Sequence, residues 1–252
     1  MNDWLDDLRT AVAFLTRLPM PHPTGPMPVN FARAHRMFPL VGAAIGGAVG
    51  LVYLGLRAIG VPDLAAAALA LGMSAILTGA LHEDGLADVA DGFGGGRDAA
   101  AKLEIMRDSR LGTYGALILM VSFVAKVSAL AMISDAGLVP SLIAAHALAR
   151  GVLPAMSMSL AYARKDGLAA NAGKPDLATA AIAGALALGI ALLALPAGSA
   201  LCAALAACIS AIGMAWLAQR QIGGQTGDVL GGAEQVAETA ILVLLAARLT
   251  QP

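Results

Sequence analysis

Charged residues are scarce in this sequence. Lys, Arg, Asp and Glu make up 13% of the 252 residues, whereas hydrophobic residues make up 58%. A soluble globular domain is about a quarter charged, so the composition excludes an ordinary soluble protein and indicates a chain embedded in lipid. The net charge of −1 leaves no broad basic surface, and we therefore expect no nucleic-acid partner.

Cysteine is almost absent, and so are the features of a signal peptide. Cys202 and Cys208 lie in one apolar run, which provides neither a disulfide framework nor a metal-ligand pattern. We expect no cleavable signal, because no basic region precedes a long apolar core. Residues 1–20 are instead amphipathic and predict a helix at the membrane interface. The proline-rich stretch 19–28 predicts extended backbone along the membrane surface.

Long apolar runs are abundant. A helix needs roughly 20 apolar residues to cross the hydrocarbon layer, and the runs predict seven spans within a range of six to eight. These lie near 38–56, 63–81, 111–133, 138–161, 177–196, 199–218 and 232–249. Pro154 predicts a break in the fourth span, and Glu234 and Glu238 are unusual in the last. The expected fold is an all-α polytopic membrane bundle, one domain over 1–252 with an interfacial segment at 1–36.

Basic residues alternate between the connecting segments. All but four of the 16 Lys and Arg lie before the first span or in the segments 82–110, 162–176 and 219–231. The positive-inside rule places these segments and the N-terminus in the cytoplasm. An enzyme that handles soluble charged substrates needs its polar groups on one side, whereas a transporter spreads them through the bilayer midplane.

A row of carboxylates occupies the start of segment 82–110. The row consists of Glu83, Asp84, Asp88 and Asp91. The three aspartates share one helix face, and such a group is costly without a cation. Oxygen ligands of this kind suit Mg²⁺ or Mn²⁺, and two such ions could clamp a phosphoryl transfer. The alternative is a solvated helix start, although the residues between the aspartates are small and apolar. His82 is a candidate ligand or partner, or an ordinary interfacial histidine.

Two further polar segments should lie on the same face as the acidic row. The first contains Lys102, Arg107, Ser109 and Arg110, followed by Gly112 and Gly115. Guanidinium groups bind phosphate in a bidentate manner, and backbone amides at the glycines could approach an anion; the alternative is a set of membrane anchors. The second is the glycine-rich loop 219–231, with Gly223, Gly224, Thr226 and Asp228 as candidate ligand contacts.

Three polar residues interrupt the apolar spans: Lys126, His146 and Arg150. Groups of this kind usually face the interior of a membrane bundle. His146 and Arg150 are one helical turn apart and could line one cavity. Pairing with the acidic row and contact with substrate are both open interpretations.

Four motifs together resemble the cobalamin synthase family, the integral-membrane adenosylcobinamide-GDP ribazoletransferases. These are "FLTRLPMP" followed by "FPLVG", "LHEDGLADVADGF", "EIMRDSRLGTYG" and "IGGQTGDVLGG". The resemblance implies a Mg²⁺-dependent phosphotransferase with corrinoid and nucleoside substrates. Adenosylcobinamide-GDP would donate its cobinamide phosphate to α-ribazole, or to α-ribazole 5′-phosphate, and release GMP. It further implies a bacterial cytoplasmic membrane with the active site facing the cytoplasm.

The same resemblance suggests roles for individual residues. The acidic row (Glu83, Asp84, Asp88 and Asp91) would hold one or two Mg²⁺ ions on the diphosphate. Asp91 would accept the proton of the ribose 3′-hydroxyl, and Arg107 and Arg110 would neutralise charge that develops toward GMP. The glycines from Gly223 onward would contact a nucleotide part.

Other functions stay open at this stage. The acidic stretch also resembles the CDP-alcohol phosphotransferases, which act on lipids, but Ala87-Asp88 stands where that family has Ala-Arg. A small transporter is the third interpretation, although the sequence shows no convincing internal repeat. The many Ala and Gly residues would suit close helix packing between subunits, so a homo-oligomer is also open.

Overall fold

The computed structural model describes residues 3–20, 30–164 and 173–249, which are almost entirely helical. The elements are α1 (Asp3–Leu15), α2 (Phe31–Ala34), the 3-10 helix η1 (His35–Met37), α3 (Phe38–Ala58), α4 (Asp63–Thr78), α5 (Leu81–Gly95), α6 (Ala99–Ile105), α7 (Thr113–Met132), α8 (Asp135–Gly151), α9 (Leu153–Ser159), α11 (Leu177–Ala194), α12 (Ala197–Ile222) and α13 (Gly227–Leu249). The prediction of an all-α polytopic bundle is confirmed.

Within the described ranges, six helical segments are long and apolar enough to cross a membrane, or seven if the bent pair of α4 and α5 forms one span. Six of the seven predicted spans coincide with these six segments, and the second coincides with only part of the bent pair. The predicted break in the fourth span is confirmed, because α8 ends at Gly151 and α9 begins at Leu153, just before Pro154. A proline at the second helical position is compatible with a new helix start.

The second predicted span, 63–81, is corrected by a sharp turn. Helix α4 ends at Thr78, and the chain bends by 92° into α5. Gly79 and Ala80 both adopt left-handed backbone conformations, with φ of 69° and 55°, and this ends the helix. The backbone N–H of Arg17 bonds the carbonyl of Leu77 at 2.7 Å, so the segment after α1 braces the turn. The acidic row therefore lies on a helix packed into the bundle rather than in a loop.

Small residues allow the helices to approach closely. Gly42 and Gly46 of α3 face α8, and a Cβ at either position would collide with backbone atoms of that helix. Alanines form equivalent buried rows on α11 and α12, such as Ala183 and Ala187 in α11. This is the packing expected in lipid, where van der Waals contact between backbones replaces the hydrophobic effect.

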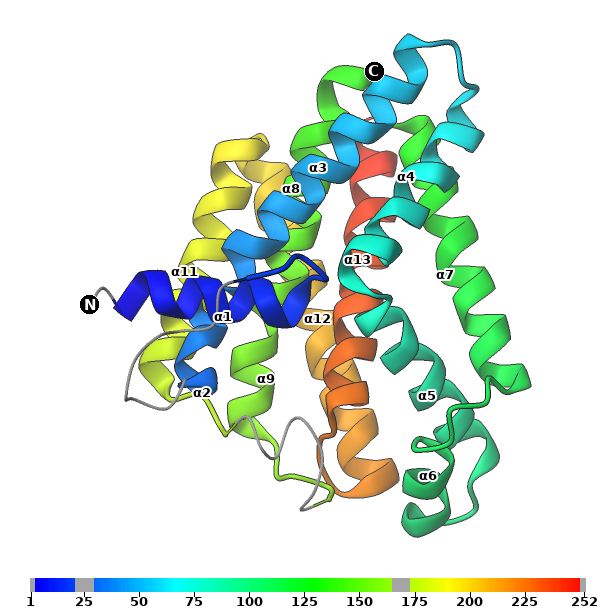
Figure 1. The fold of residues 1–252 in the computed structure, drawn as a ribbon, viewed down its shortest axis with the longest axis vertical. Helices are drawn as coiled ribbons and strands as arrows, with labels where there is room; N and C mark the ends of the chain where they lie inside the picture. The colour runs from blue at the N-terminus through cyan, green and yellow to red at the C-terminus, as the bar shows by residue number, and fades with distance from the viewer. Residues whose placement is uncertain (1–2, 21–29, 165–172, 250–252) are drawn as a thin grey trace.

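Helix α13 runs through the centre of the bundle (Figure 1) and packs against α5, α7, α8 and α12. The predicted loop 219–231 is corrected here. Helix α12 continues to Ile222 and α13 begins at Gly227, which leaves only four connecting residues. Gly223 ends α12 in a left-handed conformation with φ of 75°. Most of the glycine-rich motif therefore belongs to the first turns of the central helix.

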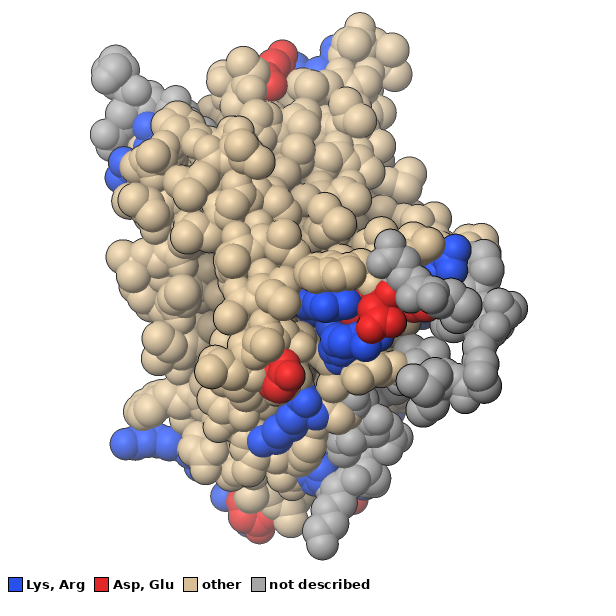
Figure 2. Space-filling model, turned by 90° about the vertical axis from the view of Figure 1, so that its left-hand side faces the viewer, with Lys and Arg blue, Asp and Glu red and all other residues tan. Residues whose placement is uncertain are grey.

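The helices alternate in direction, so the segments rich in Lys and Arg gather at one end of the molecule (Figure 1). Helix α1 lies across the bundle, and its buried Asp7 pairs with Arg33 at 3.0 Å and Arg36 at 2.7 Å. Figure 2 shows charged residues at the top edge and in the lower half of one face, with an uncharged band between them. The predicted extended stretch lies largely outside the described residues, as does Lys165 in the 162–176 segment.

Candidate functional site

The acidic helix and the glycine-rich helix meet at two glycines. A Cβ on Gly85 of α5 would lie 2.8 Å from the carbonyl oxygen of Asp228 and 3.2 Å from the Cα of Gly231. Only glycine therefore permits this approach of α5 to α13. The contact brings the acidic row beside Asp228, as the prediction of a shared face required.

Three carboxylates from these two helices form the centre of the site: Asp84, Asp88 and Asp228. Asp84 is exposed, whereas Asp88 and Asp228 are partly buried. The charge of Asp88 is within electrostatic range of both other carboxylates and of the Arg164 guanidinium. The Thr226 hydroxyl donates to Asp228 at 3.1 Å and accepts the backbone N–H of Val229 at 3.2 Å. Thr226 thus caps α13 and orients Asp228.

Arg164 is a site residue that sequence reasoning did not identify. Its Nη2 donates to an Asp228 carboxylate oxygen at 3.2 Å. Its buried Nη1 has no hydrogen-bond partner among the described residues. The sequence marked Arg164 only as one basic residue in a connecting segment, because nothing local indicates that it reaches α13.

The glycine-rich motif explains how Arg164 arrives at Asp228. Gln225 donates its backbone N–H to Ala161 at 2.8 Å, and Ala163 donates back to Gln225 at 2.9 Å. A Cβ on Gly224 would collide with Ala161. The predicted close approach at Gly224 is therefore made by the chain itself, and it holds the segment after α9 against the start of α13.

Asp91 occupies a different position from the other aspartates. One of its carboxylate oxygens accepts the backbone N–H of Gly112 at 2.7 Å, and the other accepts that of Gly115 at 2.9 Å. The two glycines do approach an anion, but that anion is Asp91, which caps α7. Both oxygens are engaged, so this geometry does not favour the predicted role of Asp91 as base.

Glu83 makes its contacts in the bundle interior, and His82 does so too while it also lines a cavity shared with Asp84 and Asp228. The Nδ1 of buried His82 lies 3.5 Å from Glu234 and 3.4 Å from Arg150. A buried oxygen of Glu83 has no hydrogen-bond partner among the described residues, and its charge interacts with that of Lys126. The structure therefore separates Glu83 from the carboxylates with which the sequence grouped it.

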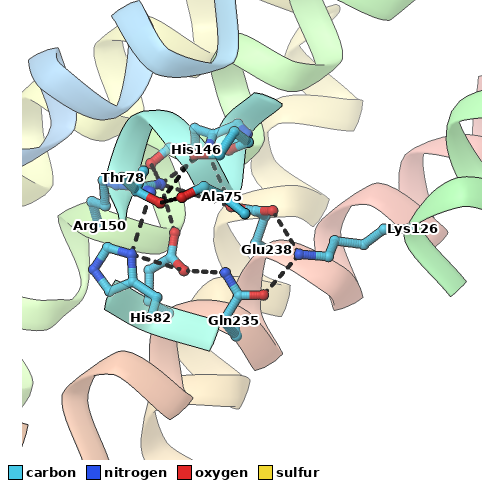
Figure 3. A network of polar contacts seen from close by, with 10 residues as sticks. Ala75, Thr78, His82, Lys126, His146, Arg150, Gln235 and Glu238 are labelled. Atoms are coloured by element: carbon cyan, nitrogen blue, oxygen red, sulfur yellow. Dashed lines mark hydrogen bonds and ion pairs between the residues drawn. The ribbon is translucent and has the colours of Figure 1, made fainter. Parts of the chain in front are cut away.

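A buried ionic network fills the centre of the bundle (Figure 3). Arg150 pairs with Glu234 at 2.5 Å, and Lys126 pairs with Glu238 at 3.2 Å. His146 lies 3.0 Å from Glu238. The interior bases thus form their ion pairs with α13, and in the acidic row only the charge of Glu83 interacts with one of them, Lys126. The interpretation that they pair with the acidic row is corrected for its aspartates. These partners also explain why two glutamates are tolerated in the last span.

Metal binding fits the three aspartates better than the buried network. Among the described residues, His146, Glu234 and Glu238 are the one group of three whose ligand atoms lie within 4.8 Å of one another. Those carboxylates already face Lys126 and Arg150, so a divalent ion would add excess positive charge. Asp84, Asp88 and Asp228 are more widely spaced, with Arg164 as the cation close to Asp228. Such a set suits an ion that also binds water and substrate oxygens.

The predicted basic residues lie further along the chain, around α6 and the connection to α7. The Lys102 ammonium donates to Gln221 at the end of α12. The Nε of Arg110 donates to Asp108 at 3.0 Å, and these hydrogen bonds lower the pKa of Asp108. Arg107 and Ser109 are exposed on the same connection. Their predicted contacts with substrate stay predictions.

A cavity of about 190 Å³ adjoins the carboxylates. Its lining includes the polar residues His82, Asp84, Arg164 and Asp228 and the ring side chains of Phe14, Phe31, His35 and Phe38. No local pattern in the sequence groups these aromatic residues with the acidic row. They come from α1, α2, η1 and α3, and only the folding of α1 across the bundle places them beside α5.

This arrangement defines a polytopic helical membrane protein with a carboxylate and guanidinium site at one end of the bundle. The chain belongs to the cobalamin-5-phosphate synthase family, whose model matches residues 7–246.

Several curated relatives are similar over nearly the whole chain. A protein of Bradyrhizobium diazoefficiens is 47% identical over 242 residues, which cover 96% of this chain and 93% of the relative. Proteins of a Sinorhizobium species and of Mesorhizobium japonicum are 42% and 43% identical, and the alignments cover 98% of this chain and 98% and 95% of those relatives. All three are named adenosylcobinamide-GDP ribazoletransferase. No solved structure matches this chain.

Proposed function

We propose that this chain is a membrane-bound adenosylcobinamide-GDP ribazoletransferase. The 3′-oxygen of α-ribazole, or of its 5′-phosphate, attacks the phosphorus that carries cobinamide. The bond from that phosphorus to the GMP oxygen breaks, and the hydroxyl proton passes to a base. The observation that carries the proposal is the convergence of Asp84, Asp228 and Arg164 at one cavity, with Asp88 within electrostatic range of all three, in a chain that belongs to this family.

The three aspartates are the residues we assign to a Mg²⁺ ion. Bound there, the ion would neutralise charge on the diphosphate of the donor. Asp228 replaces Glu83 and Asp91 in the predicted ligand set, because it faces Asp84 across the contact of α5 with α13. Mn²⁺ has the same preference for oxygen ligands and should substitute.

We assign the role of base, in place of Asp91, to the carboxylate oxygen of Asp84 that the ion does not bind. Asp84 is exposed and lines the cavity, so its carboxylate can reach a hydroxyl bound there. Asp228 is less suited, because one of its oxygens already accepts bonds from Thr226 and Arg164.

Arg164 is the residue we assign to a phosphate oxygen of the substrate. Its buried Nη1 has no hydrogen-bond partner in the described chain, the residue lines the cavity, and a guanidinium that holds Asp228 with Nη2 can bind phosphate with Nη1. The segment after α9 and the start of α13, which carry Arg164 and Asp228, lie toward the end of the bundle that gathers the basic segments (Figure 1). That placement supports a site on the cytoplasmic face of a bacterial cytoplasmic membrane.

The test uses the full-length protein in nanodiscs with adenosylcobinamide-GDP, α-ribazole and Mg²⁺. Mass spectrometry should detect cobalamin and GMP in equal amounts, and EDTA should abolish both. Asp88→Asn should lose turnover, whereas Asp63→Asn, at the opposite end of the bundle, should retain it. Absence of product from a folded protein with either acceptor would overturn the proposal, and lipid product from a CDP-activated donor would establish the alternative phosphotransferase.

A further inference from the structure

Aromatic side chains are concentrated at the cavity beside the three aspartates. Only 4% of the chain is aromatic, and it contains five phenylalanines. Three of these, Phe14, Phe31 and Phe38, line this one cavity. The remaining two, Phe93 and Phe123, do not. Such a concentration is unexpected in a bundle that otherwise packs through Ala and Gly.

The rings form a continuous wall. Phe14 and Phe31 meet edge to face with centroids 4.6 Å apart, and Phe14 and Phe38 are parallel within 12° at 5.9 Å. His35 stacks on Phe38 at 4.5 Å. Phe38 and His35 are buried, whereas Phe14 and Phe31 keep part of their surface accessible. All four side chains line the cavity, and Phe14 and Phe31 are the two with accessible ring surface.

The size and polarity of the cavity select a class of ligand. A cavity of about 150 Å³ is enough for benzene, so about 190 Å³ suits a somewhat larger flat ring system. A lipid chain is disfavoured, because the same cavity contains Asp84, Asp228 and Arg164, which would be desolvated beside it. A planar ring joined to a polar group matches both the aromatic wall and the charged residues that line the same cavity.

The hydrogen-bonding groups at the aromatic wall distinguish between two kinds of base. A guanine ring carries a carbonyl and several N–H groups that need partners when buried. Among the four ring side chains of the wall, the one polar group is His35, whose Nδ1 already lies 3.0 Å from the Phe31 carbonyl oxygen. The other polar side chains that line the cavity, among them His82 and Ser157, do not belong to the wall. The wall therefore favours a fused aromatic base with few polar atoms.

We propose that the aromatic wall binds the flat, largely apolar base of the nucleoside acceptor, with its ribose toward Asp84 and Asp228. This inference rests on the proposed function for the identity of the acceptor. Aromatic stacking on Phe14 and Phe31 holds the base. The ribose hydroxyl then lies in the same cavity as the carboxylates, and a 5′-phosphate on the acceptor would bind the Arg164 guanidinium.

The test compares Phe14→Leu and Phe31→Leu with Phe123→Leu, which changes an exposed ring on α7. Two readouts are needed: KM for α-ribazole and for adenosylcobinamide-GDP, and equilibrium binding of α-ribazole without the donor. Both cavity variants should raise the acceptor KM and dissociation constant about tenfold, the scale of a lost stacking contact. The donor KM should not change, and Phe123→Leu should match the wild type in every readout.

The outcomes separate this inference from the proposed function. Unchanged acceptor binding and KM in folded Phe14→Leu and Phe31→Leu proteins, with turnover intact, would overturn the aromatic subsite alone. A rise in the donor KM without a change for the acceptor would assign the wall to guanine and overturn it as well. Binding of α-ribazole that depends on Phe14 and Phe31, without turnover, would support the subsite and contradict the proposed reaction.

Discussion

The Asp91 carboxylate accepts the backbone N–H of Gly112 at 2.7 Å. Its other oxygen accepts the N–H of Gly115, so one side chain on α5 closes the first turn of α7. This relationship ties the helix that carries the acidic row to the next span. It also accounts for both glycines of "RLGTYG", since a Cβ at either position would collide with Asp91.

Asp91→Asn should lower the free energy of unfolding by about 1–3 kcal/mol, because an amide cannot accept both backbone N–H groups and leaves one unsatisfied. Thermal unfolding in detergent would measure the loss. Asp88→Asn is the matched control and should lose activity while it unfolds at the wild-type temperature. If Asp91→Asn unfolds like the wild type but has no turnover, the capping role is wrong, and Asp91 rather than Asp84 would be assigned as the base.

Gly112→Ala should be destabilising, because the added methyl group meets the Asp91 carboxylate and the cap must open. The loss should be comparable to that of Asp91→Asn, and the two changes should not be additive, since they act on one contact. Gly213→Ala is the control: nothing lies within 4 Å of its Cβ position in α12. That change should stabilise the helix by up to about 1 kcal/mol.

Removal of one member of the buried ionic network should be severe. Arg150→Met leaves Glu234 without its 2.5 Å partner at a position with no exposed surface. Loss of one partner of a buried pair costs about 3–5 kcal/mol. Combining Arg150→Met with Glu234→Gln should recover part of that loss, and a double-mutant cycle on unfolding temperatures would measure the coupling. Additive effects would show that the pair is not coupled.

Arg164→Lys should reduce kcat/KM by about 10- to 100-fold, the scale of a lost charge-assisted hydrogen bond. A lysine keeps the charge but cannot hold Asp228 and a phosphate oxygen with one planar group. Arg220→Lys, whose guanidinium lies over the Trp216 ring, is the matched control and should retain activity. Equal kinetics for both variants would remove Arg164 from the site.

Ala80→Gly should raise the free energy of unfolding by about 0.5–1 kcal/mol. Ala80 has a φ of 55°, which costs a residue with a Cβ about 1–2 kcal/mol, and the greater freedom of glycine in the unfolded chain offsets part of the gain. Ala65→Gly, at an exposed position in α4, should be destabilising instead. A loss of stability in both variants would contradict strain at the turn.

Some of the site was predictable from the sequence. The acidic row was recognised from the spacing of Asp84 and Asp88, and Asp228 from its isolation among glycines, since both are local patterns. Arg164 was missed because its contact with Asp228 depends on backbone pairing between segments more than 60 residues apart. Phe14 was missed because its place in the cavity depends on how α1 crosses the bundle, which is also a contact between segments distant in the sequence.

The sequence by itself determined which segments are apolar enough to span the membrane and how the basic segments alternate between them, because crossing a membrane depends on the composition of each segment in turn. It did not determine the limits of every helix, since the turn at Gly79 and the start of α13 differ from the prediction. Only the tertiary structure decided which polar group meets which. Asp88 and Asp91 belong to the same face of α5, yet Asp91 caps α7 whereas the charge of Asp88 interacts with that of Asp228. A glutamate such as Glu234 is unexpected in an apolar span, and its ion pair with Arg150 explains why it is tolerated there. Charges interact through space, and the distances between them are set by helix packing rather than by position along the chain.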